Sequence, residues 1–288
     1  MKINNINLKN DINLLNKLIA EYEEVKLNLF NELKDSCINW QDGNSVDFEN
    51  KIYLEKVESD NILRTLTDKR DILNFIYDKY SNLGEKIKCD LNNRSALLRS
   101  IESCQSQANS IINEFYKIDN SFYYWEQQSI SNQKNKILKV KNDLSEVKNS
   151  ITKMFDKIEE IEKEIKVKIK KIDEIKINNF DYNVASTGTR INKGILNGSL
   201  LEKNIEKIKY YSSEEKKLLN KIDKELNEVS KNYNSNNTTL FLNSGSNFKT
   251  NIDSVYKKRN TYTTILNETI IKYNELTVAT QQIFDKEV

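Results

Sequence analysis

The sequence contains no histidine among its 288 residues, so the most common acid–base catalyst and metal ligand is absent. Carboxylates are the main alternative, and the densest cluster consists of Glu159, Glu160, Glu162 and Glu164. Such a cluster could bind a metal ion, but on a helix with alternating lysines and glutamates it is typical of a solvated surface. We therefore expect no metal site and no carboxylate-based active site.

A second candidate for chemistry is the loop-like segment 186–190, which reads Ser-Thr-Gly-Thr-Arg. Its composition is similar to that of phosphate-binding loops. It lacks the Gly-x-x-x-x-Gly-Lys spacing, however, and no strand pattern precedes it. We interpret the segment as part of a linker and expect no bound cofactor.

The three cysteines, Cys37, Cys89 and Cys104, are odd in number and widely spaced. No Cys-x-x-Cys pair is present, which excludes a zinc knuckle and a thioredoxin-type motif. We expect buried or half-buried thiols that serve in packing. With no histidine and no reactive cysteine pair, the sequence predicts a protein that is not an enzyme.

The charge pattern argues against nucleic acid as a partner. The chain has 45 basic and 43 acidic residues, a net charge of +2, and the two signs are interleaved instead of forming a basic patch.

Membrane contact also has little support. Lys166, Lys168, Lys170 and Lys171 form a local basic group that could touch anionic lipid, but acidic neighbours on both sides favour an ordinary surface. The polar residues 1–16 do not resemble a signal peptide, and no run of about 18 apolar residues occurs. We expect synthesis in the cytoplasm, with any export by a route that needs no cleaved signal.

The composition favours long helices as the elements that carry these side chains. The chain has no proline, only six glycines, 31% charged and 38% hydrophobic residues, as expected for helices that bury one stripe and solvate the rest. Apolar residues recur at steps of three and four on both sides of Gly43, which predicts an antiparallel hairpin. Residues 164–170 also alternate in a way that fits a strand, but the flanking pattern favours helix.

Glycines and polar breaks divide the chain into four ranges. We predict helical hairpins over residues 1–84, 85–176 and 199–288, with a linker over 177–198 that holds three glycines. The predicted fold class is therefore all-α, with three tandem long antiparallel helical hairpins that form elongated helical bundles. Asn44 is a candidate cap of the second helix, and Ser199 with Glu202 forms a candidate capping box after the linker.

The turns of the first and third hairpins share a spacing. A bulky residue precedes a phenylalanine by eight positions in both, a glycine and a serine lie between them, and isoleucine follows four positions later. In the middle turn Trp125 is retained, but glutamine stands eight positions later and no glycine is present. The residues predicted to form this hairpin-turn motif are Trp40, Gly43, Ser45, Phe48, Trp125, Leu240, Gly245 and Phe248. In physical terms, the bulky residue would close the open end between two helices, and the glycine would let the chain reverse.

Residues 1–85 resemble the WXG100 family, small helical hairpins of the type VII (ESX) secretion pathway with a Trp-x-Gly turn. Here the turn reads Trp40-Gln41-Asp42-Gly43, with the glycine one place late, and Phe48 follows. The resemblance extends more weakly to the other two hairpins, which would make the chain a tandem array. The LXG toxins of the same pathway carry a related long helical region, but no separate toxin-like domain follows here.

The family's export signal, Tyr-x-x-x-Asp/Glu just beyond the second helix, has no match at the end of this sequence. The pattern occurs instead at Tyr210 with Glu214 and at Tyr211 with Glu215, within the third hairpin. The resemblance therefore implies a secreted substrate, or a helper that travels with or presents a partner that carries the signal.

The odd number of hairpins suggests how the protein would act. Two hairpins can close a bundle, which leaves the third with an apolar stripe for a homodimer or another protein partner. Two further hypotheses remain open: a cytoplasmic or phage-derived coiled-coil scaffold, and a membrane-active pore former built from amphipathic helices.

Overall fold

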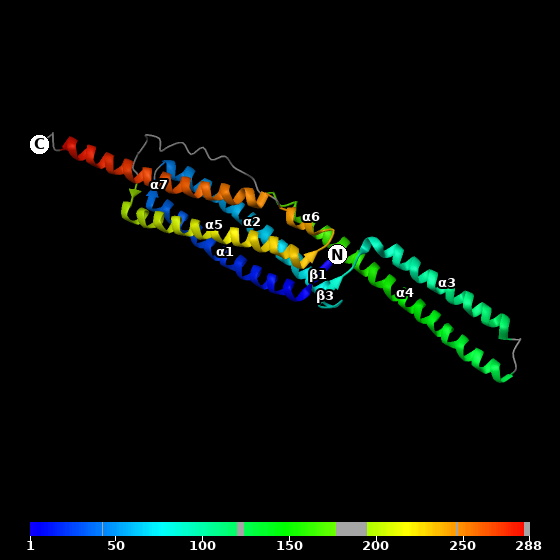
Figure 1. Cartoon of the computed structure of the whole chain (residues 1–288). Coiled ribbons are helices and arrows are strands. Elements are labelled where there is room, and N and C mark those ends of the chain that lie inside the picture. The colour runs from blue at the N-terminus through cyan, green and yellow to red at the C-terminus, as the bar shows by residue number, and fades with distance from the viewer. Residues whose placement is uncertain (42, 120–123, 177–194, 246, 285–288) are drawn as a thin grey trace. The chain divides into compact units, whose positions relative to one another are not determined.

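The computed structural model describes residues 1–41, 43–119, 124–176, 195–245 and 247–284. These residues are almost entirely helical, which confirms the all-α prediction (Figure 1). The helices are α1 (Asn5–Asn39), α2 (Gly43–Ser81), η1 (Leu91–Asn93), α3 (Arg94–Asp119), α4 (Tyr124–Ile172), α5 (Gly198–Asn232), α6 (Thr238–Asn243) and α7 (Asn247–Phe284). Residues 164–170 lie within α4, as the flanking helical pattern predicts.

Short strands join the helices. They are β1 (Lys2–Asn4), β2 (Trp40–Gln41), β3 (Lys86–Lys88), β4 (Ile195–Leu196) and β5 (Tyr233–Asn234). One sheet has the order β3-β1-β5. In the other, β2 and β4 are antiparallel, with Trp40 opposite Leu196 and Gln41 opposite Ile195. The sequence did not predict these strands, because two or three residues are too few to show a period.

The chain divides into two compact units. The smaller consists of Met1–Lys2 and Ile87–Lys166, and the larger of Ile3–Lys86 and Val167–Val288. The first and third predicted hairpins thus belong to one unit, because their apolar stripes face each other. Most of the predicted second hairpin forms the smaller unit.

In the larger unit α1 is antiparallel to two neighbours (Figure 1). Against α2, Lys26 pairs with Asp60 at 2.5 Å, and the Asn5 side chain donates to the Tyr80 carbonyl at the far end. Against α5, hydrogen bonds join Asn7 to Asn232 and, at the other end, Asn204 to Glu32. Since α7 packs against α5, the apolar stripes of α1, α2, α5 and α7 meet in one core.

In the smaller unit α3 and α4 form an antiparallel hairpin. Arg94 bonds to Asp156, Lys148 to Glu102 at 2.8 Å, and Gln105 to Ser145 at 2.8 Å. Each step along α3 between these contacts matches an equal step back along α4. The two helices therefore keep one register along the hairpin.

Helix starts differ in detail from the sequence prediction. The Asn197 side chain accepts from the backbone N–H of Leu200 and caps α5, so the predicted Ser199–Glu202 box is wrong by position. A helix that begins one residue earlier takes the preceding Asn as its cap. Similarly, α2 begins at Gly43, which places Asn44 inside the first turn and not at its cap.

Gly245, between α6 and α7, occupies a position that excludes side chains. Its φ is +60°, and its N–H donates to the Asp173 carboxylate at 3.0 Å. A Cβ built on Gly245 would lie 2.7 Å from Thr65 Cγ2 and 3.3 Å from Ile172 Cγ2. The turn therefore needs glycine for both its backbone conformation and its packing.

We expect Gly245→Ala to lower the free energy of unfolding by about 1–3 kcal/mol, through left-handed strain and overpacking. The control is Gly198→Ala in the first turn of α5, where a Cβ meets no atom within 4 Å. That change should be neutral or stabilising by up to about 1 kcal/mol. Chemical denaturation followed by circular dichroism measures both, and equal stability of the two variants would contradict the packing assignment.

Candidate functional site

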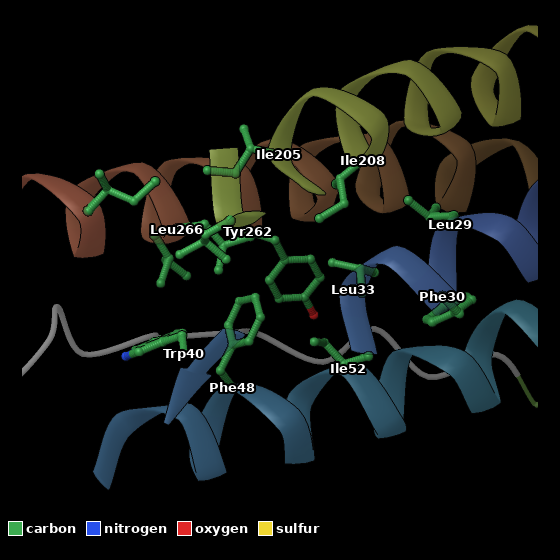
Figure 2. Packing of buried hydrophobic residues seen from close by; sticks show 13 residues of the cluster. Leu29, Phe30, Leu33, Trp40, Phe48, Ile52, Ile205, Ile208, Tyr262 and Leu266 are labelled. Carbon is green, nitrogen blue, oxygen red and sulfur yellow. The ribbon is translucent and has the colours of Figure 1, made fainter. Parts of the chain in front are cut away.

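Trp40 is fully buried at the end of the α1–α2 hairpin. The ring centroids of Trp40 and Phe48 are 5.5 Å apart, and Phe48 meets Tyr262 of α7 edge-on at 5.3 Å. Figure 2 shows the three rings together, with aliphatic side chains from α1, α5 and α7 around them. Trp40 therefore lies in the core that the two hairpins share, and does more than close its own hairpin.

The other predicted turn residues are not brought together as a repeated device. Ser45 is buried in the first turn of α2, after Gly43. Leu240, the counterpart of Trp40, is half-buried within helix α6, whereas Trp40 is in a strand. Gly245 follows α6, at the position described above. Trp125 and Phe248 are the second residues of α4 and α7, and their side chains lie outside the described part of the structure.

A buried charge network lies close to the aromatic cluster. The Arg259 guanidinium of α7 bonds to Glu55 of α2 and to Glu215 of α5 (3.3 Å), and it donates to Ser59 at 3.2 Å. It also lies 4.9 Å from the centroid of the Phe30 ring of α1. Arg259 thus contacts each of the other three helices of this bundle, and the sequence offered no signal for it.

The electrostatics of this network match a structural role. Burial raises the pKa of Glu55, and the charge of Arg259 opposes that rise. Burial by itself would lower the pKa of Arg259, but Glu55 and Glu215 more than offset it, so this pKa is raised. The three side chains have almost no exposed surface, so they hold helices together and offer no access for a substrate.

Lys69 of α2 is a second buried cation. Its ammonium donates to the carbonyls of Phe241 (3.0 Å) and Leu242 (3.2 Å) in α6, and lies over the Phe241 ring. Burial lowers the pKa of Lys69 to about 8, although Asp223 and Asp173 oppose the shift. Lys69 therefore fixes the C-terminal turn of α6, where carbonyls have no intrahelical partner.

The residues that suggested chemistry have structural roles. Glu159 pairs with Arg94 at 2.8 Å, and within the described ranges no group of three or more Cys, Asp or Glu side chains could hold a metal. Lys168 of the basic group lies over the Phe75 ring. Residues 186–190 lie outside the described residues.

The thiols differ from one another. Cys37 is half-buried and burial raises its pKa to about 12, and Cys89 is also half-buried. The prediction of a buried or half-buried thiol is wrong for Cys104, which is exposed. Cys104 lies beside the α3–α4 seam and not within it, so no second helix covers it.

The main unexplained surface is an apolar face on the α3–α4 hairpin. Along α3 it comprises Leu97, Cys104 and Ile111, and along α4 it comprises Val140, Val147 and Met154. The five residues other than Cys104 are 43% to 53% exposed. We call these six residues the heptad face, because successive members on each helix are seven positions apart.

The register of the hairpin places the two halves of the heptad face side by side. Leu97 is level with Met154, Cys104 with Val147, and Ile111 with Val140, one residue away from the ladder set by Gln105 and Ser145. The opposite edge of the hairpin is polar and carries the Lys148–Glu102 pair. The signal for this face was present in the sequence, but alone it did not show which apolar residues the hairpin leaves uncovered.

A shallower groove of about 570 Å³ lies between α1 and α2. Apolar side chains such as Leu27 and Tyr53 line it together with charges of both signs, including the paired Lys26 and Asp60. The groove is less uniformly apolar than the heptad face.

One of the two Tyr-x-x-x-Glu patterns is accessible. Tyr210 is 61% exposed, and Glu214 pairs with Lys217 at the surface. In the other pattern, Glu215 is buried against Arg259. Only the first of these two patterns can therefore be recognised without disturbing the core.

Comparison with known proteins finds no match among protein-family models, curated proteins or solved structures. None of the helices in the described ranges combines the length and apolar character that a membrane span requires.

Removing the guanidinium from the buried network should be costly. We expect Arg259→Ala to lower the free energy of unfolding by about 3–5 kcal/mol, because it leaves two buried carboxylates without their cation. The matched control is Arg70→Ala on α2, which breaks an exposed pair with Asp71 and should cost at most about 1 kcal/mol. Similar losses in both variants, measured by denaturant titration, would show that Arg259 is not a core clamp.

Lys69 should make stability depend on pH. Its folded pKa of about 8 lies below the unfolded value, so between about pH 8 and 10.5 the unfolded chain binds more protons and stability rises with pH. Relative to Lys69→Met, the native protein should gain up to about 3 kcal/mol across this window and nothing below it. Unfolding curves of both proteins at several pH values measure the difference, and a difference that stays flat would refute the assignment.

Proposed function

We propose that this protein is a non-enzymatic component of a type VII (ESX) secretion pathway, either an exported substrate or a helper. It acts by packing an exposed helical face against another protein chain. The heptad face is the observation that carries the binding part of this proposal. A row of apolar side chains in register on two rigid helices matches the way amphipathic helices recognise one another.

The physical case for binding rests on unburied apolar surface. Two helices that pack only against each other bury one seam each, and the residues beside that seam stay in water. Scattered apolar side chains on a surface are ordinary, but a contiguous patch in register favours an interaction site.

The pathway is supported by the sequence of the first hairpin. Trp40-Gln41-Asp42-Gly43 with Phe48 resembles the turn of the WXG100 family, and Trp40 and Phe48 pack against each other. The exposed Tyr210-x-x-x-Glu214 pattern offers a candidate for recognition by the export machinery.

Export can be tested together with the heptad face. The protein should appear in culture supernatants of the native host and should disappear from them when the secretion ATPase is deleted. Ile111→Glu places a charge in the heptad face and should reduce its export, or that of the protein it helps, several-fold. Asn109→Glu adds the same charge nearby on α3 at an exposed position outside the face and should have no effect.

Each result has a distinct meaning. Protein found only in the cytoplasm of both strains would remove the secretion role and favour the scaffold function, which the same hairpin geometry also fits. Equal export of Ile111→Glu and Asn109→Glu would separate the heptad face from secretion.

A further inference from the structure

The heptad face has a shape that matches itself. Its two rows run antiparallel at the same levels, so rotation by half a turn about the long axis of the hairpin exchanges the level of every residue with itself. A second hairpin placed by this rotation would set α3 of one copy against α4 of the other. All neighbouring helices would then be antiparallel, as in a four-helix bundle.

The polar residues just outside the face agree with this arrangement. On α3 the outer edge carries Ser100, Gln107 and Glu114, and on α4 it carries Lys136, Asp143 and Ser150, all exposed. The half-turn sets Glu114 against Lys136 of the second copy, and Gln107 against Asp143 of the second copy. It brings no like charges together. A two-fold axis across the helices would instead bring Asp143 close to its own copy near the centre of the interface, which is unfavourable.

The area is sufficient for a stable complex. With 26 residues, α3 is about 39 Å long at 1.5 Å per residue. Two helices side by side span about 20 Å, at about 10 Å each. The face therefore offers roughly 800 Å² per copy, which is the usual contribution of one partner to a specific protein–protein interface.

We propose that the heptad face binds the heptad face of a second copy of this chain, in a dimer whose two-fold axis runs parallel to α3 and α4. The dimer core consists of Leu97, Cys104 and Ile111 against Val140, Val147 and Met154. The inference rests on the proposed function only in that both assign protein binding to this face. It does not depend on secretion.

The test is sedimentation equilibrium of the purified full chain. The mass should rise from the monomer value of 33.8 kDa to twice that value between ~1 and ~100 μM. Ile111→Glu should weaken association at least about tenfold, because it buries an unpaired charge. Asn109→Glu should associate like the native protein. Circular dichroism of both variants verifies that the helices are intact.

Charge reversal tests the direction of the axis. Glu114→Lys and Lys136→Glu should each weaken the dimer, and the double variant should restore it, because the pair forms across the interface. Failure of the double variant to recover would overturn the parallel two-fold axis.

A chain that stays monomeric throughout the concentration range would overturn the inference, as would a dimer that Ile111→Glu leaves unchanged. Neither result removes the proposed function, which fails separately if Ile111→Glu and Asn109→Glu are exported alike.

Discussion

The structure depends on one constraint: a long helix with a single apolar stripe is not stable until that stripe is buried against other helices. In the larger unit, α1 meets this requirement twice, against α2 and against α5. The stripe on each side then continues into α7, so that one core forms from segments at both ends of the sequence. Trp40 and Tyr262 belong to that same core, although more than two hundred residues separate them.

The α3–α4 hairpin meets the same constraint only in part. Its inner seam is buried, with Ile101, Ile112 and Phe155 among the covered side chains. The heptad face beside that seam stays exposed because two helices provide no third surface to cover it. The most distinctive surface of the protein is thus a direct consequence of how few helices this unit contains.

The buried charges add specificity to an otherwise uniform helical core. Apolar stripes on long helices can slide by a turn at small cost, whereas Arg259 must meet Glu55 and Glu215 at one register. Lys69 similarly places α6 against α2. Because an unpaired buried charge is strongly unfavourable, alternative packings are excluded. We regard this as the physical reason for charged groups in the core of a protein with no active site among its described residues.

The sequence by itself determined the helices and most of their ends. Steps of three and four apolar residues, the absence of proline and the placement of Gly43 and Gly245 are local signals, and the helix period can be read from them directly. The sequence also contained the seven-residue spacing of Leu97, Cys104 and Ile111. It could not show that Cys104 is exposed, or that Asn197 and not Ser199 caps α5, because these depend on the neighbours of each residue in space.

Only the tertiary structure decided which hairpins pack together. Stripes of the same period are interchangeable in a sequence, so the first hairpin could have met the second as readily as the third. The choice depends on contacts between distant residues, such as Arg259 with Glu55 and Glu215, which leave no periodic trace. The same holds for the strands that join Trp40 to Leu196. The supposed repeat of Trp40 at Leu240 shows the limit most clearly, since equal spacing gave a strand at one site and a helix at the other.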